Sequence, residues 1–225
     1  MNERVLDIHV LLDSDHNIYK SIINECTYIG LDSILESDFN HLRVFHINAN
    51  RLTVDGRLEL LEQKIVDYYD VICISETWLK DENFMLYNLN GFKHYAVCRA
   101  KSKGGGVSVF IREQFSSHEV QISTNSDESV QVLGISILRR GIRANIVTVY
   151  PNHRSRLNEM ISHLEIVLHK LPSLIFTIIT GDLNIDLTSN RNDTSQLISA
   201  MASWGFIPTI SLPTRFASNS CIDHF

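Results

Sequence analysis

The sequence predicts an α/β fold, a four-layer α/β sandwich in which two packed β-sheets are flanked by helices. Two observations predict it. From residue 42 onward, continuous apolar runs that suit buried strands alternate with segments of helical periodicity, and the middle of this region is a series of apolar runs joined by short turns. Helices between buried strands, with hairpins in the middle, are typical of two stacked sheets with helices outside them.

The first elements form a strand, a helix and a strand. Residues 42–47 alternate in the way a half-buried strand does. Asp55 is the expected N-cap of a helix, because the apolar residues that follow it recur at helical spacing. Val71–Ile74 is a continuous apolar run, which suits a strand covered on both faces. The helix positions expected to be apolar and inward are Leu58, Leu61, Ile65 and Val66.

The middle of the chain predicts four strands joined as hairpins. The turns are marked by the triple glycine at 104–106, which enters a strand and is followed by no Lys-Ser/Thr pair, and by residues 139–141. A hairpin turn is therefore favoured over a phosphate cradle for the triple glycine. The expected strands are Tyr95–Arg99, Val107–Ile111, Val130–Leu138 and Ile142–Tyr150.

The last part of the chain predicts a helix over 155–170, a buried strand over 174–179 and a helix over 195–204. The stripe expected to face the core of the first helix consists of Leu157, Ile161, Leu164 and Leu168. We expect residues 42–225 to form one domain. Residues 1–41 form an acidic extension, and two alternatives stay open for it: a short helical segment or a poorly ordered one.

Composition and charge bound the function. The 225 residues are 44% hydrophobic, which is enough for a buried core. Residues 1–41 hold eight acidic and two basic side chains, so they carry the whole net charge of −6, and residues 42–225 are neutral. A neutral body lacks the broad basic surface of proteins that grip nucleic acid by bulk electrostatics. Contacts to phosphates must then be local.

Cysteine usage and hydropathy indicate the compartment. The four cysteines lie far apart without a C-x-x-C pair, which favours neither a zinc site nor a disulfide framework. The first residues have no apolar signal region, and no stretch approaches the roughly 18 apolar residues needed to cross a bilayer. We expect a soluble intracellular protein without a membrane segment, nuclear if it acts on DNA.

Five short segments carry the chemistry, and each follows a predicted strand. Open α/β sheets usually hold their ligands at such strand ends. Carboxylates, amides and a tyrosine are the groups that phosphodiester chemistry uses to neutralise charge and activate water. The segments are His46 to Leu52, Ile74 to Leu79, Val149 to Asn152, Thr180 to Asn184 and Ser220 to Phe225.

In this order and at these separations, the segments resemble the endonuclease/exonuclease/phosphatase superfamily, most closely the endonuclease domain of LINE-like non-LTR retrotransposons. The resemblance covers residues 42–225. It is most specific in Ser-Glu-Thr-Trp-Leu at 75–79, Gly-Asp-Leu-Asn at 181–184, and Pro-Thr-Arg-Phe at 213–216 leading into Ile-Asp-His at 222–224.

The resemblance implies a role for each candidate residue. Glu76 binds a divalent metal, Mg²⁺ with Mn²⁺ as an alternative, and one or two carboxylates with water and phosphate are what Mg²⁺ prefers. Asp182 orients and deprotonates the attacking water, and Asn184 holds the phosphate oxygens or the nucleophile. Asp223 orients a catalytic histidine. The residues that bind the scissile phosphate or shape the metal site are Tyr150, Asn48, Asn50 and Asn152.

The sequence also departs from the family's pattern at two points. The family's histidine lies in a Ser-Asp-His segment after the Ile-Asp-His segment, and the sequence ends at Phe225. His224 directly follows Asp223, so on a strand their side chains point to opposite faces. We therefore expect a domain whose final strand is missing and a site that is recognisable but incomplete. An inactive site is favoured over an active one. The family usually has one more residue between the tyrosine and the proline or asparagine than the Tyr150-Pro151-Asn152 segment has.

Three functions stay open from the sequence. The first is a metal-dependent DNA endonuclease of retrotransposon origin. The second is a phosphatase or phosphodiesterase acting on inositol phosphates, lipids or RNA, because one fold serves many substrates. The third is a non-catalytic, element-derived protein that binds DNA or a partner.

Several charged residues outside the five segments are interpreted as ordinary surface groups in preference to functional ones. The basic clusters Arg99/Lys101/Lys103 and Arg139/Arg140/Arg143 are read as solvated hairpin tips in preference to DNA contacts. Asp186 is read as a loop acid.

Overall fold

The computed structural model describes residues 42–101, 103–124, 126–139, 141–153, 155–173, 175–210, 214 and 220–224. These residues belong to two compact units, one that extends to Asn184 and one that begins at Ile185, and each is described by itself. The predicted acidic extension at 1–41 lies outside the described residues.

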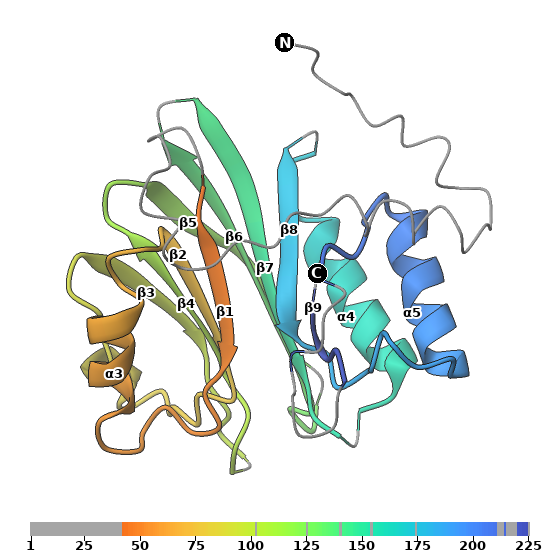
Figure 1. The fold of residues 1–225 in the computed structure, drawn as a ribbon, viewed down its shortest axis with the longest axis horizontal. Coiled ribbons are helices and arrows are strands. Elements are labelled where there is room, and N and C mark those ends of the chain that lie inside the picture. The colour runs from red at the N-terminus through yellow and green to blue at the C-terminus, as the bar shows by residue number, and fades with distance from the viewer. Residues whose placement is uncertain are drawn as a thin grey trace. The chain divides into compact units, whose positions relative to one another are not determined.

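The first sheet of the larger unit is mixed. Its parallel pair is β1 (Val44–Asn48) and β2 (Val71–Ser75), and β4 (Val107–Arg112) pairs antiparallel with β2 and with β3 (Phe92–Val97). The strand order is β1-β2-β4-β3 (Figure 1). Every residue of β2 is buried, as its unbroken apolar run predicts.

The second sheet of this unit has four strands in the order β5-β6-β7-β8. Three antiparallel neighbours, β5 (Ser116–Thr124), β6 (Val130–Arg139) and β7 (Ile142–Pro151), precede β8 (Phe176–Asp182), which runs parallel to β7. Arg139 pairs with Ile142, so the β6–β7 connection is the tight hairpin that the sequence predicts.

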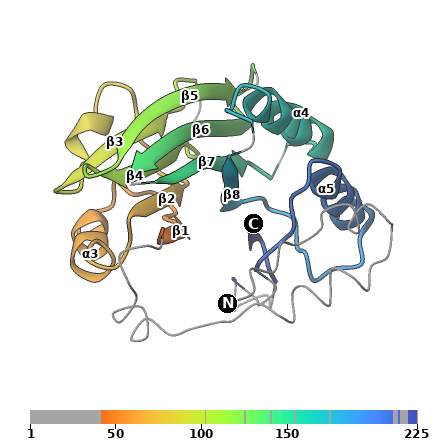
Figure 2. The same cartoon turned by 90° about the horizontal axis from the view of Figure 1, so that it is seen from above.

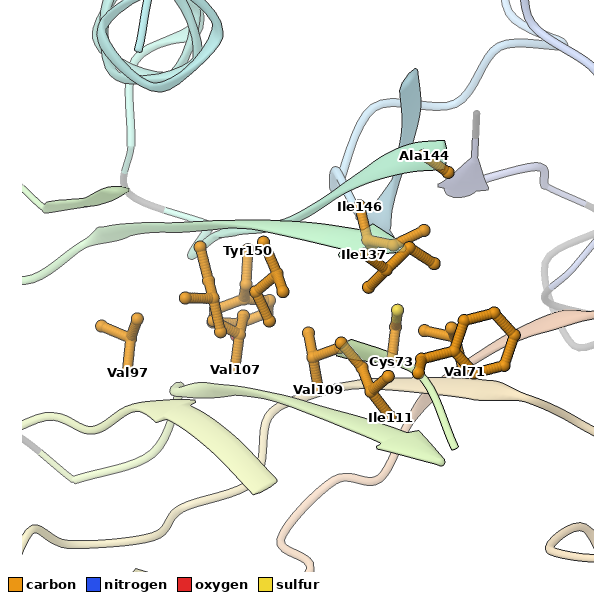
Figure 3. Close-up of a cluster of buried hydrophobic side chains, with 13 residues drawn as sticks. Val71, Cys73, Val97, Val107, Val109, Ile111, Ile137, Ala144, Ile146 and Tyr150 are labelled. Atoms are coloured by element: carbon orange, nitrogen blue, oxygen red, sulfur yellow. The ribbon is translucent and has the colours of Figure 1, made fainter. Parts of the chain in front are cut away.

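One core fills the space between the two sheets. Side chains of β2 and β4, among them Cys73 and Val109, meet side chains of β6 and β7 such as Ile137 and Ile146 (Figure 3). Burial raises the pKa of the Cys73 thiol to about 12, so this cysteine stays neutral and acts as a small apolar side chain.

Helices form the outer layers. On the first sheet, Leu61 of α3 (Arg57–Lys64) joins a second apolar cluster with Ile72 and Phe110. On the second sheet, α4 (Leu157–Leu168) approaches β6 so closely that a Cβ added at Gly134 would lie 2.6 Å from Val167. Figure 2 shows the two sheets side by side. The predicted α/β sandwich of two packed sheets flanked by helices is confirmed.

The smaller unit contains α5 (Asn192–Ser203) and β9 (Asp223–His224). Asp186 joins two segments of this unit, because its Oδ1 accepts hydrogen bonds from the backbone N–H groups of Thr188 and Cys221, both at 3.0 Å. Its interpretation as a loop acid agrees with these contacts.

Four local expectations are corrected. Asp55 is not the cap of α3, because Gly56, with a left-handed φ of 81°, occupies that position and no side chain caps the helix. The strand expected at 95–99 starts and ends earlier, as β3. The polar strand β5 is absent from the predicted elements, because most of its residues are exposed or half-buried and it shows no clear alternation. The buried stripe of α4 is Met160, Leu164 and Val167, so of the residues expected to line it only Leu164 is fully buried.

Candidate functional site

The candidate site lies where parallel strands of both sheets end. Asn48 is the last residue of β1, and Glu76 follows β2, its parallel neighbour. In the other sheet, Tyr150 lies at the end of β7 and Asp182 ends β8. The carboxyl ends of parallel neighbours meet at one edge of a sheet, which explains why residues far apart in the sequence converge.

The Asn48 side chain joins the two sheets at this edge. Its Nδ2 donates to Glu76 Oε1 at 2.9 Å and to Asp182 Oδ2 at 2.7 Å. Its Oδ1 accepts the backbone N–H of Asn50 at 2.8 Å, which fixes the amide orientation so that both N–H groups face the carboxylates. One amide therefore holds two acids of opposite sheets beside each other.

Two backbone segments hold Glu76. The segment after β1 is bonded to the segment after β2 through Arg51 N–H to Glu76 O (2.7 Å) and Leu52 N–H to Thr77 O (3.0 Å). The Arg57 guanidinium donates to the carbonyls of residues 49, 50 and 51. Glu76 itself has a left-handed φ of 53°. Non-glycine residues in this region store strain and gather at functional sites.

The triple glycine supports the other side of the Glu76 segment. Thr77 N–H donates to Gly106 O at 3.3 Å, and Trp78 N–H donates to Gly105 O at 2.8 Å. A Cβ added at Gly106 would lie 2.7 Å from Thr77 Oγ1, so a side chain has no room there. The predicted hairpin is confirmed, and the close approach explains why glycine is needed in it.

Asp182 is a buried carboxylate with an altered acidity. It is 3% exposed. Burial raises its pKa above the ordinary value, as does the nearby charge of Glu76, while hydrogen bonds from Asn48 and from the backbone N–H of Asn184 (3.0 Å) oppose the rise. The residue before it must be glycine, because a Cβ at Gly181 would lie 1.9 Å from the Val149 carbonyl oxygen.

Tyr150 packs in the core between the sheets and supports Glu76. Its side chain points between the sheets beside Val107 (Figure 3) and is 4% exposed. Burial raises the pKa of its hydroxyl, and the charge of Glu76 and a hydrogen bond with Glu76 raise it further. The hydroxyl therefore stays protonated and donates to the carboxylate.

Three amide residues predicted for the site lie in its loops. Asn184 Nδ2 donates to Pro151 O at 2.6 Å, which links the loop after β8 to the end of β7. Asn152 N–H donates to Ser129 O at 2.7 Å, and its Oδ1 accepts from Ser155 Oγ at 3.3 Å. Asn50 is exposed and reaches the site through its backbone N–H.

Asp223 is the remaining predicted residue. It lies on β9 in the smaller unit, so its role beside a histidine stays a prediction. Of the Pro-Thr-Arg-Phe segment, only Thr214 is among the described residues; its Oγ1 accepts the Ile222 N–H at 3.2 Å.

Sequence reasoning missed a polar network beneath the triple glycine. Arg99 is 5% exposed, and it donates from Nε to Glu128 O at 2.6 Å and from Nη1 to Gly104 O at 3.2 Å. Gln131, the cross-strand partner of Tyr150, accepts the Gly106 N–H at 3.0 Å. Arg99 is thus a structural residue, and its interpretation as part of a solvated hairpin tip is wrong.

The donor set fits a hard divalent cation. Glu76 and Asp182 offer carboxylate oxygens side by side, and in the part of the chain that the structure describes neither forms an ion pair with Lys, Arg or His. No cluster of three His, Cys, Asp or Glu side chains suitable for a metal occurs among the described residues. Two carboxylates, completed by water and phosphate, are what Mg²⁺ prefers.

These features define a class of protein: an α/β sandwich with two carboxylates at the strand ends, which is the fold of the metal-dependent phosphodiesterases. The sequence profile described as Endonuclease/Exonuclease/phosphatase family matches residues 35–225. The chain belongs to this family, whose members typically use a divalent metal. A search of curated proteins found no significant match.

Solved structures share the fold at low identity. The endonuclease domain of TRAS1, a telomere-specific non-LTR retrotransposon, is 15% identical with a TM-score of 0.60, covering 81% of this chain and 82% of that one. Mannosyl-6-phosphatase of Bacteroides thetaiotaomicron is 17% identical with a TM-score of 0.56 and coverages of 82% and 84%. TDP2 of D. rerio, complexed with a single-strand DNA product, is 16% identical with a TM-score of 0.50 and coverages of 74% and 66%.

Within the described ranges, no helix combines the length and the apolar character needed to cross a bilayer.

Proposed function

We propose that the chain is a Mg²⁺-dependent phosphodiesterase that nicks DNA, of the retrotransposon endonuclease type. The observation that carries the proposal is the Asn48 amide, which holds the carboxylates of Glu76 and Asp182 together at the joined ends of two sheets. Two fixed carboxylates that form no ion pair with any described Lys, Arg or His suit a metal ion and an anionic substrate. The similarity in fold to the TRAS1 endonuclease domain is consistent with this choice.

Glu76 would hold the metal, which would supply positive charge to the phosphoryl oxygens when it is bound. Asp182 accepts the proton of the attacking water, and its raised pKa makes it a stronger base than an ordinary aspartate. The new bond joins the water oxygen to phosphorus, the bond from phosphorus to the 3′ oxygen breaks, and the leaving 3′ oxygen takes up a proton from solvent. Tyr150 and Asn48 keep the carboxylates in place, and Asn184 contacts the phosphate or the water.

The test is nicking of supercoiled plasmid by the purified chain in Mg²⁺ and in EDTA. Against the inactivity that the sequence alone favours, we expect nicking in Mg²⁺ alone, which would show that the site works without the histidine of the Ser-Asp-His segment. The rate should fall by about 100-fold or more in Glu76→Gln and in Asp182→Asn. The matched control is Glu119→Gln, the same change of carboxylate to amide at an exposed position of β5, which should leave the rate unaltered.

Three outcomes would overturn the proposal. Equal nicking by Glu76→Gln and the unsubstituted chain would mean that the nicking does not depend on the Glu76 carboxylate. Release of inorganic phosphate from small phosphomonoesters, without nicking, would favour the phosphatase alternative. A chain that does neither would be a non-catalytic member of the family.

A further inference from the structure

One exposed cation lies directly beside the Glu76 segment. Arg51 is exposed, and its backbone N–H donates to the Glu76 carbonyl at 2.7 Å. Its φ of 81° is in the left-handed region, which a non-glycine residue rarely adopts. The bonds on either side of it, Ala49 N–H to Ser75 O at 2.9 Å and Leu52 N–H to Thr77 O at 3.0 Å, fix this backbone. The Arg51 side chain therefore starts from a rigid position next to the site.

The guanidinium is held in place although it is exposed. Its Cζ lies 5.6 Å from the centroid of the Trp78 ring, and Arg51 Nε donates to Thr53 Oγ1 at 3.2 Å. The backbone of Gly104 supports the indole, since a Cβ added at Gly104 would lie 3.3 Å from the ring. A cation–π contact with the ring and one hydrogen bond orient the planar guanidinium before a ligand arrives.

Neighbouring basic side chains are already used by the fold. Arg57 donates to three loop carbonyls, Arg99 is buried against Glu128 O and Gly104 O, and Lys101 Nζ donates to Ser126 O at 3.0 Å. For Arg51, Nε is the one side-chain nitrogen with an acceptor among the described residues. Its two terminal nitrogens can therefore bind a ligand.

The guanidinium is not paired with the carboxylates of the site. It lies over Trp78, two residues beyond Glu76, and in the described structure no ion pair joins it to Glu76 or Asp182. A small diester, which carries the scissile phosphate alone, distinguishes a second phosphate bound by Arg51 from the one beside the two carboxylates.

We infer that Arg51, oriented by Trp78 and Thr53, binds a second phosphate of the same strand, next to the scissile one. Arg recognises phosphate through two parallel N–H···O bonds, which supply position and affinity. The substrate class is accordingly a polynucleotide, because a small phosphoester has no second phosphate. This inference rests on the proposed function and adds a second phosphate contact to its site.

The experiment separates binding from chemistry. Binding of a fluorescein-labelled DNA duplex is measured by anisotropy in Ca²⁺ over a series of salt concentrations, and hydrolysis of bis(p-nitrophenyl) phosphate, a small diester, is measured in Mg²⁺. For Arg51→Ala we expect about 10-fold weaker DNA binding and a salt slope smaller by about one. We expect an unchanged rate on the small diester. Arg51→Lys should restore the slope and only part of the affinity, because it keeps the charge and loses the planar fork.

The matched control is Arg139→Ala. Arg139 also lies over an aromatic ring, with its Cζ 5.2 Å from the centroid of Phe115, but it is at the β6–β7 turn, the opposite end of β7 from Tyr150. It should change neither quantity. Equal DNA binding and salt slope in Arg51→Ala and the unsubstituted chain would overturn the inference, as would an equal loss on the small diester. Failure of the unsubstituted chain to hydrolyse the small diester would instead count against the proposed function, because the anisotropy measurement tests Arg51 without hydrolysis.

Discussion

The two ends of β2 each carry an acid, and the protein treats them in opposite ways. Asp70 precedes the strand and is 2% exposed. Its Oδ2 accepts the backbone N–H of Arg43 at 3.0 Å and Nε of the same arginine at 3.3 Å, and Arg112 Nε lies 3.8 Å from Oδ1. Protein cations and a backbone donor thus compensate this buried charge.

Glu76, at the other end, meets a second acid instead of a cation. Only amide and hydroxyl groups among the described residues bind the pair, through Asn48, Tyr150 and the Asn184 backbone. Amides orient carboxylates without neutralising them. The difference teaches that Asp70 serves stability and that Glu76 and Asp182 keep negative charge available for a cation and substrate from solution.

The largest effect expected in this comparison concerns the Glu76 end of β2 and the rate of nicking. Gly106→Ala forces a methyl group to within 2.7 Å of Thr77 Oγ1 and should displace the Glu76 segment. We expect nicking to fall by about 10- to 100-fold, because small displacements of catalytic groups are costly. The measurement is the rate of plasmid nicking by Gly106→Ala, expressed per folded molecule.

Gly141→Ala is the control for this change. Gly141 has a φ of 89°, close to the 86° of Gly106, but an added Cβ would meet nothing within 4 Å. It shares the backbone strain and lacks the crowding, so its nicking rate should stay normal. Equal losses in the two variants would mean that strain alone explains the effect.

A smaller effect, on the free energy of unfolding, tests the Asp70 end of β2. Asp70→Asn leaves Arg43 and Arg112 without their carboxylate, and we expect the free energy of unfolding to fall by about 1–3 kcal/mol, since both arginines are partly exposed. Urea unfolding measures it. Nicking per folded molecule should be unaffected. A stable but inactive Asp70→Asn variant would break the distinction between the two ends of β2.

The smallest effect concerns pH. The folded pKa of Asp182 is raised above 3.8, so the folded state binds its proton more tightly than the unfolded state. This group therefore makes the fold less stable as the pH rises from 3.8 through the raised pKa. In metal-free buffer, the stability of Asp182→Asn relative to the unsubstituted chain should increase with pH over this window and then level off. A relative stability that decreases with pH would contradict the burial argument.

Strand ends were predictable, and side-chain partnerships were not. Apolar runs before Glu76 and Asp182 locate both acids at the ends of strands, which is enough to predict that they approach each other. The sequence contains no signal that Asn48 bridges them, because an amide after a strand can equally form a turn.

Backbone conformation accounts for most of what the sequence could not reveal. The left-handed φ values of Arg51, Glu76 and Trp78 belong to non-glycine residues, which propensity assigns elsewhere. The contact between Arg51 and the Trp78 ring depends on them. The charge cluster around Arg99 has the pattern of a solvated hairpin tip, whereas the acceptors of Arg99 are the carbonyl of the nearby Gly104 and that of Glu128, 29 residues away.

The most direct test of the central claim is Mn²⁺ binding, followed by electron paramagnetic resonance without substrate. The account predicts about one Mn²⁺ ion per folded chain, lost in Glu76→Gln and retained in Asp70→Asn. Binding that survives Glu76→Gln and disappears in Asp70→Asn would contradict it, because the acid compensated by arginines would then be the metal ligand.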